Sequence, residues 1–204
     1  MCQFVYLVVS VIPILCVFHK EQYKYLTVRN PNPPTLKAQI KLHKDGNPIR
    51  PVINNIHAPS YKAARRLNKI LQQCLNLGNQ YTVVNSVTLA QDLMKLNISN
   101  KHRLITMDIN DLYVNIPITE TIDITTTQLL QHNYPETTAQ IFTLLGVILQ
   151  QNYFIFQEKI YQPGKGIAMC SPISGTIAES FLQHLEQIYI KPLIDTKHIL
   201  FYTR

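Results

Sequence analysis

Charged residues and glycine are scarce in this sequence of 204 amino acids, and tryptophan is absent. Asp, Glu, Lys and Arg together make up 15% of the residues, and glycine occurs six times. In a typical soluble domain about a quarter of the residues are charged. The low charge therefore hints at surface that a partner or further chain normally covers. The apolar fraction of 46% is large enough for a buried core.

Cysteines are also few and lie far apart, at positions 2, 16, 74 and 170. None belongs to a Cys-x-x-Cys pair, and no histidine cluster accompanies them. This spacing disfavours a structural zinc site and a disulfide framework, and a reducing interior is the default. We therefore expect an intracellular protein, in the nucleus or the cytoplasm.

The longest apolar run stands at the start of the chain, MCQFVYLVVSVIPILCVF at residues 1–18. It is slightly short for a membrane span and is interrupted by Pro13. It also lacks the basic region and cleavage site of a signal peptide. A buried segment or the chance start of a broken reading frame is favoured, and membrane association stays open. Residues 19–34 end in Asn-Pro-Asn-Pro-Pro, which is typical of a linker.

Basic residues outnumber acidic ones, 19 against 12, which gives a net charge of +7. Such an excess suits a polyanionic partner such as nucleic acid, although a basic globular protein without that partner has the same composition. Residues 36–42 alternate apolar and polar and predict a strand, which Asp45-Gly46 turns into a return strand from Arg50. The hairpin brings Lys41, Lys44 and Arg50 together, either as a solvated face or as a clamp for phosphate.

Helices are predicted where apolar residues recur every three or four positions after a capping residue. The expected helices run from Ser60 to Gly78, from Ser86 to about Leu96, from Thr119 onward, through residues 141–149, and from Ser171-Pro172 to Pro192. In the first of these, Arg65, Arg66 and Lys69 lie off the apolar stripe. They form either a solvated face or a surface that follows a phosphate backbone.

Three further segments read as strands. A short hairpin is expected at 153–162 around Gln157-Glu158, and a final strand at 199–202. The run at 104–109 is apolar and predicts a buried strand, which Asp108 interrupts. A carboxylate in that position needs a partner, and a divalent metal ion is one such partner. A hydrogen-bonded strand-end Asp is the commoner structural role.

Two segments considered together indicate a protein family more specifically than either segment alone. LITMDINDLYVNIP resembles the first palm motif of reverse transcriptases, in which a strand carries a metal-binding Asp and an aromatic residue follows five positions later. GIAMCSPISGTIAE resembles the second palm motif, and KLHKDGNPIRPVINNIHAPSY resembles the fingers. The amino-acid sequences of all three segments are similar to those of Penelope-like retroelements, whose reverse transcriptases are related to the catalytic subunit of telomerase.

The resemblance implies an α/β (α+β) fold, with the fingers at about residues 35–100 and an incomplete palm at about 101–204. Residues 1–34 form a separate apolar segment and linker. In this family an aromatic-x-Asp-Asp motif should follow soon after ILFYTR, and the thumb and an endonuclease domain are often attached. We therefore expect a truncated RNA-directed DNA polymerase that needs the missing C-terminal half of the enzyme. Asp195 follows a helix and lies in the wrong context to replace the absent carboxylates.

The chemistry implied is nucleotidyl transfer by two metal ions, Mg²⁺ or Mn²⁺. Asp108 would be the catalytic metal ligand, and the carbonyl of Ile109 a further one. Arg50, with Lys41 or Lys44, would hold the triphosphate. Asp111 would lie beside the triphosphate or serve only as a turn residue. Tyr113 would lie beneath the sugar and select deoxynucleotides; a plain core aromatic is the alternative.

Gly166, Cys170, Ser171 and Pro172 would shape the surface for an RNA template and a DNA primer. The family usually has glycine at the position of Cys170, where a side chain would either crowd this surface or, if φ is positive, strain the backbone. The expectation is a chain without polymerase activity. The alternative is a non-catalytic nucleic-acid-binding protein derived from the same fragment.

Overall fold

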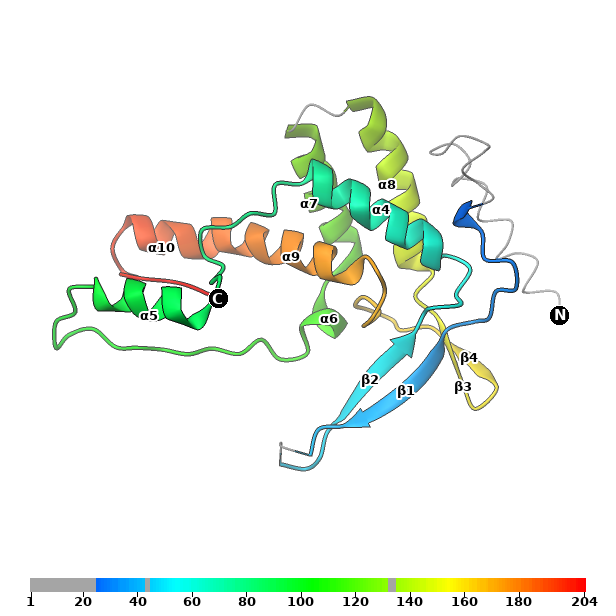
Figure 1. Ribbon diagram of the computed structural model, residues 1–204, viewed down its shortest axis with the longest axis horizontal. Coiled ribbons are helices and arrows are strands. Elements are labelled where there is room, and N and C mark those ends of the chain that lie inside the picture. The colour runs from blue at the N-terminus through cyan, green and yellow to red at the C-terminus, as the bar shows by residue number, and fades with distance from the viewer. Residues whose placement is uncertain (1–24, 43–44, 132–134) are drawn as a thin grey trace.

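The computed structural model describes residues 25–42, 45–131 and 135–204 (Figure 1). The apolar run 1–18 and the predicted nucleotide ligand Lys44 lie outside these residues. The described chain combines a small sheet with a layer of helices, which confirms the mixed α and β class. No helix in these ranges has the length and apolar character that a membrane crossing requires.

The sheet has four strands in the order β2-β1-β3-β4. One antiparallel hairpin pairs β1 (Thr35–Ile40) with β2 (Ile49–Asn54), and the other pairs β3 (Phe154–Phe156) with β4 (Lys159–Tyr161). Strands β1 and β3 run parallel, so the two hairpins form one sheet. Gln157 and Glu158 both have positive φ, as in the tight turns that suit hairpins. Both predicted hairpins are therefore confirmed.

Four helices enclose the core: α4 (Tyr61–Cys74), α7 (Ile118–Gln131), α8 (Pro135–Gln150) and α9 (Ser174–Leu185) (Figure 1). Each contributes apolar side chains spaced three or four residues apart, which places them on one side of the helix. The fully buried members include Leu67, Leu71, Ile141, Leu144, Leu145 and Ile177. The apolar faces predicted for α4 and α8 are confirmed, whereas the face predicted for the last helix is buried at Ile177 but exposed at Ile188.

The predicted helix boundaries were wrong at several ends. Helix α4 has no side-chain cap at Ser60 and ends at Cys74, before Gly78, because Leu75 is extended and buried in the core. Asn85, not Ser86, caps α5 (Ser86–Met94), and its side-chain oxygen accepts from the Thr88 amide at 2.9 Å. In each case tertiary packing or a neighbouring side chain outweighs the local signal.

Two further helix ends differ from the prediction. Helix α7 starts at Ile118, so Thr119 lies inside its first turn and is not the cap. Pro192 does not end the last helix, because α9 continues through η1 (Glu186–Ile190) and α10 (Lys191–Asp195). The wider π-helical turn of η1 precedes the proline, and a proline near the start of a helical turn removes no bond that the helix needs.

Residues 104–109 form no strand, which corrects the prediction of a buried one. They are exposed throughout, with Leu104 at 89% and Met107 at 78%. A strand needs a neighbouring strand for its backbone groups, and none of the four described strands pairs with this segment. Residues 199–202 form no strand either. Instead Arg204 exchanges backbone hydrogen bonds with Tyr81 and Val83 at 2.9 and 3.0 Å.

Candidate nucleotide cleft

An open cleft lies between the β1–β2 hairpin, the start of α6 (Leu112–Asn115) and the loop before α9. Its volume is about 610 Å³, within the range of small-molecule sites. Segments far apart in sequence meet here, since the lining residues come from the hairpin, from 108–113 and from 169–175. Of the residues predicted as ligands, Lys41, Arg50, Asp108, Ile109, Asp111, Tyr113, Cys170 and Ser171 all line this cleft.

The hairpin wall is basic. Gln39 and Arg50 are opposite each other in the β1–β2 register, and Lys41 directly follows the last residue of β1, where its amide donates to the Pro48 carbonyl. Because side chains alternate between the two faces of a strand, Gln39 and Lys41 share one face. Lys41 Nζ lies 3.8 Å from a carboxylate oxygen of Asp111, and this ion pair links the hairpin to the opposite wall.

The opposite wall holds the predicted carboxylates. Asp108 and Ile109 lie on the exposed segment that precedes α6, and Asp111 takes a left-handed conformation at the start of that helix. The Val114 amide and the Asn115 side chain both donate to the Asp111 carbonyl, at 3.0 and 3.2 Å. Tyr113 is half-buried, lines the cleft and packs against the core. The position of its ring is therefore compatible both with selection of deoxynucleotides and with a plain core role.

Gly166 does not line the cleft but fixes the turn beside it. Its φ is +80°, and a Cβ atom here would lie 2.4 Å from the Val114 carbonyl oxygen. The Asn152 side chain donates to the Gly166 carbonyl at 3.0 Å, and the Ile167 amide donates to the Tyr113 carbonyl at 2.8 Å. Only glycine fits this position, which agrees with a shaping role.

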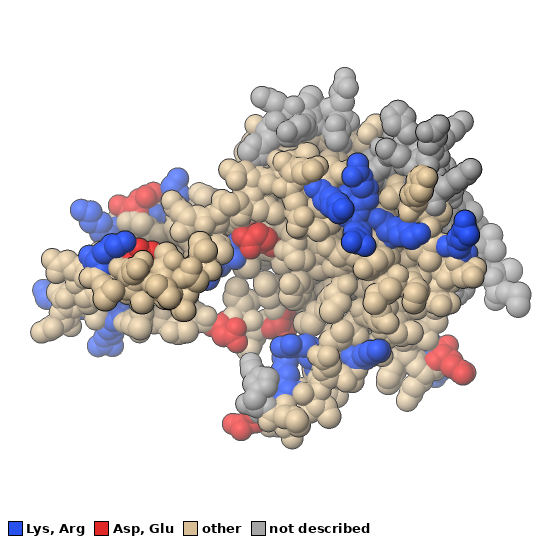
Figure 2. Space-filling model, viewed as in Figure 1, with Lys and Arg blue, Asp and Glu red and all other residues tan. Residues whose placement is uncertain are grey.

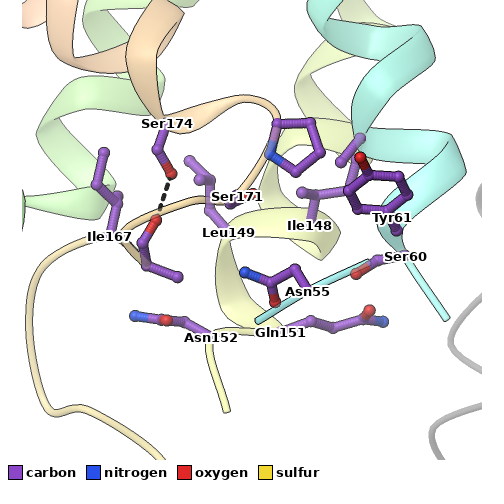
Figure 3. A pocket seen from close by; sticks show the side chains of 13 residues that line it. Asn55, Ser60, Tyr61, Ile148, Leu149, Gln151, Asn152, Ile167, Ser171 and Ser174 are labelled. Atoms are coloured by element: carbon purple, nitrogen blue, oxygen red, sulfur yellow. Dashed lines mark hydrogen bonds between the residues drawn. The ribbon is translucent and has the colours of Figure 1, made fainter. Parts of the chain in front are cut away.

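The predicted helix start at Ser171 and Pro172 was wrong, since α9 begins at Ser174. Ser171 lines both the cleft and a second, small pocket, whereas Pro172 lines only the second. In this second pocket Ser174 Oγ donates to the Ala168 carbonyl at 2.7 Å (Figure 3). Its volume of about 20 Å³ is the space of roughly one water molecule, so it is no ligand site.

Cys170 has a φ of +70°, which is unusual for a residue with a side chain. The side chain is exposed and lines the cleft. The backbone conformation at Cys170 is therefore the one for which strain was expected. Glycine would adopt this φ without strain, because it has no Cβ atom.

Opposite charges face each other in the cleft, with Lys41 and Arg50 on one wall and Asp108 and Asp111 on the other. Figure 2 shows acidic side chains next to basic ones at the edge where Figure 1 places the β1–β2 hairpin. Carboxylate oxygens are the ligands that Mg²⁺ prefers. Within the described ranges, however, no group of three or more His, Cys, Asp or Glu side chains is arranged to hold a metal ion.

Several lining residues were not predicted: Gln39, Val52, Asn110, Leu112, Met169, Ser174 and Gly175. The alternation of the hairpin strands carries the signal for Gln39, which lies two positions before Lys41. Val52 likewise lies two positions after Arg50 on the partner strand. The other five lie inside the two segments that resemble the palm motifs, but no residue-level signal in the sequence singled them out.

A cluster around Arg204 was also missed. The guanidinium bonds Glu179 and Glu186, with Nε 2.6 Å from Glu186, whose side chain is only 4% exposed. Asn79 and Tyr202 donate to the same Glu186 carboxylate. Hydrogen bonding from Arg204 holds the pKa of Glu179 below its ordinary value, and the two carboxylates raise the pKa of Arg204. Burial, followed by the charge of Glu186, raises the pKa of Tyr202.

No protein-family model matches the chain, and no curated protein matches it significantly. We therefore infer the function of the cleft from the geometry of its own residues and from the resemblance of its motifs to those of reverse transcriptases.

Proposed function

We propose that this chain is part of an RNA-directed DNA polymerase of the Penelope-like type and that the cleft is its deoxynucleotide site. One observation carries the proposal. The three segments that resemble reverse transcriptase motifs, in the hairpin, at 108–113 and at 169–175, line the same cleft. Three segments that resembled reverse transcriptase motifs only by chance would not be expected to line the same cleft. In this proposal the hairpin and α4 belong to the fingers, and residues 101–204 belong to the palm.

Each lining residue then has a role. Arg50 and Lys41 bind the triphosphate, because a guanidinium offers phosphate a bidentate pair of donors. Lys44, by resemblance alone, assists them. Tyr113 lies beneath the sugar, where its ring leaves no room for a 2′-hydroxyl. Asp111 orients Lys41 through their ion pair.

The loop before α9 forms the surface for the RNA template and DNA primer. Cys170 and Ser171 face the cleft, while Gly166 and Pro172 shape the turns behind it. The close packing of Gly166 against Val114 brings the backbone of this loop against α6. Small residues are suited to such a surface because they let a base pair approach the backbone.

Asp108 and the Ile109 carbonyl are the oxygen ligands proposed for Mg²⁺ or Mn²⁺, which when bound supplies positive charge to phosphate oxygens. A two-metal centre needs further carboxylates. Asp111 is the other carboxylate that lines the cleft, and Lys41 pairs with it. The described residues thus supply part of a metal site and not the full set. We therefore propose that the chain by itself binds nucleotides without polymerising them.

Non-catalytic nucleic-acid binding by the same cleft is the second candidate. It is favoured by the position of Asp108 on an exposed segment without regular secondary structure. Catalytic carboxylates need rigid support, since small displacements of reacting groups are costly. Basic groups that bind phosphate tolerate such freedom better, because charge attraction has no strict geometry.

Nucleotide binding tests the proposal. A fluorescent deoxynucleoside triphosphate is titrated with the native chain, with Arg50→Gln, and with Lys191→Gln as a control that removes the same charge from exposed α10. We expect Arg50→Gln to weaken binding about tenfold, because a hydrogen bond to a charged group contributes at least ~1.5 kcal/mol. The control should change little. Equal affinities for all three chains would reject the cleft as a triphosphate site.

Primer extension tests the catalytic part. With an RNA template, a DNA primer and Mg²⁺ or Mn²⁺, we expect no incorporation by this chain. Synthesis that disappears in Asp108→Ala would contradict this expectation and would show a complete catalytic centre in the cleft.

A further inference from the structure

The exposed face of α4 is basic from Lys62 to Lys69. Lys62, Arg65, Arg66 and Lys69 occur at intervals of three and four residues, so they form one stripe on the helix, and all four are exposed. Figure 2 shows a concentration of basic side chains over the region where Figure 1 places α4. None of the four lines the nucleotide cleft.

No acidic side chain of α4 balances the positive charge of this stripe. Helix α4 contains no Asp or Glu, and in the described part of the chain none of the four side chains forms an ion pair. Lys62 donates to the Thr27 carbonyl at 3.0 Å, which neutralises no charge. Like charges three and four residues apart repel, so an anionic partner would stabilise this face of the helix.

The dimensions of the stripe fit a phosphate backbone. From Lys62 to Lys69 a helix rises about 10 Å, because each residue adds about 1.5 Å. Phosphates of one duplex strand follow each other at about 3.4 Å along the axis, so the stripe spans about three of them. Two of the four residues are arginines, which bind phosphate through two donors at once.

The neighbouring residues distinguish among anionic partners. The exposed residues of α4 are basic or amide side chains, with Gln72 and Gln73 continuing the polar face. None of the exposed side chains of α4 is apolar, so this helix offers nothing that would enter a lipid surface. None of them is aromatic, so the helix offers no exposed ring to stack on unpaired bases. We propose that Lys62, Arg65, Arg66 and Lys69 bind the phosphodiester backbone of a nucleic-acid duplex, outside the cleft and independently of nucleotide binding.

Salt-dependent binding tests this surface. The full chain is compared with a variant in which Lys62, Arg65, Arg66 and Lys69 become Gln. The control variant changes exposed Lys101, Arg103, Lys191 and Lys197 to Gln and loses the same charge. The ligands are a duplex RNA, a duplex DNA of the same sequence, the single strands, and vesicles of phosphatidylserine in phosphatidylcholine. Circular dichroism checks that each variant is folded.

For the duplexes we expect the α4 variant to bind at least about tenfold more weakly at 50 mM salt, with the slope of log affinity against log salt reduced by about 3. The control should lose less than about threefold. Equal losses in both variants would reduce the effect to net charge and overturn the proposal. Vesicle binding that depends on α4 while duplex binding does not would overturn it in favour of a membrane.

Two single variants keep the proposal testable if the fourfold variant does not fold. Arg65→Gln and Arg66→Gln should each reduce the salt slope by about 1, without changing the affinity for a deoxynucleoside triphosphate. Failure of this surface is thereby distinguishable from failure of the cleft, since Arg50→Gln tests the cleft alone. Unchanged slopes in both single variants would contradict the proposal.

Discussion

The Ile167 amide donates a hydrogen bond of 2.8 Å to the carbonyl of Tyr113. This bond joins the segment after Asp108 to the turn before α9, which are more than fifty residues apart in the sequence. Lys165 reinforces the link by donating to the Asn115 side chain at 2.9 Å. The two palm-like motifs are thus held together by the backbone itself, and the conformation of Gly166 decides whether the link can form.

Gly166→Ala tests this link. The added methyl group meets the Val114 carbonyl, and the positive φ strains any side chain, so we expect a loss of at least about 2 kcal/mol in the free energy of unfolding. The matched control is Gly146→Ala inside α8, where the methyl group meets no atom and helix propensity rises by up to about 1 kcal/mol. Urea denaturation measures both. A tolerated Gly166→Ala would refute the close approach to Val114.

Cys170 offers the opposite test, because its backbone already has the conformation that glycine prefers. Cys170→Gly relieves about 1 kcal/mol of left-handed strain and loses a similar amount to the freer unfolded chain. We therefore expect unchanged or slightly higher stability. Cys170→Val should instead lose about 1–2 kcal/mol, since a β-branched residue tolerates positive φ poorly. Equal stabilities of the two variants would show that the left-handed backbone carries no strain.

Arg204 anchors the last described residues through Glu186. Arg204→Gln leaves this nearly buried carboxylate with only Asn79 and Tyr202 as donors, so we expect a loss of about 2 kcal/mol. Arg29→Gln, at an exposed position, is the control for lost charge. Thermal and urea denaturation measure the difference. A loss no larger than that of the control would show that the cluster contributes nothing to stability.

The same cluster predicts a pH dependence. Because the pKa of Glu179 is lower in the folded than in the unfolded chain, its contribution is complete above the ordinary glutamate pKa and disappears as pH falls through the lower folded value. Stability of the native chain should therefore decrease below about pH 4.5. In Arg204→Gln the decrease should be shallower, because the hydrogen bond that lowers this pKa is gone. Parallel curves for the two chains would contradict the assignment.

The exposed apolar segment 104–109 predicts self-association. Met107→Lys should reduce the binding of a hydrophobic dye and delay aggregation, with stability unchanged within about 0.5 kcal/mol because the site is exposed. Thr106→Lys adds the same charge without removing apolar surface and serves as the control. If both variants delay aggregation equally, net charge and not the apolar segment is responsible.

The two hairpins could be predicted from sequence because their signals are local. Asp45-Gly46 and Gln157-Glu158 turn the chain, and the alternating strands beside them pair with each other. The strand predicted at 104–109 is absent from the structure, and no local signal could have shown this. The segment is apolar, but a strand also needs a neighbouring strand to pair with. The described residues provide no such neighbour for it.

The candidate site shows the same division. The residues of the three motifs were identified from their resemblance to reverse transcriptase motifs, and their meeting in one cleft follows from folding. The Lys41–Asp111 ion pair and the Ile167–Tyr113 hydrogen bond join residues far apart in sequence, so no local pattern reports them. The Arg204–Glu186 contact has no local signal for the same reason.

Discrimination between sugars tests the central claim most directly. The dissociation constants of a deoxynucleoside and a ribonucleoside triphosphate are measured with the native chain and with Tyr113→Val, which removes the ring from the cleft. We expect the native chain to prefer the deoxynucleotide by about tenfold or more, roughly 1.4 kcal/mol, and Tyr113→Val to lose most of this preference. Equal affinities for both sugars in the native chain would contradict the proposed role of Tyr113 and of the cleft.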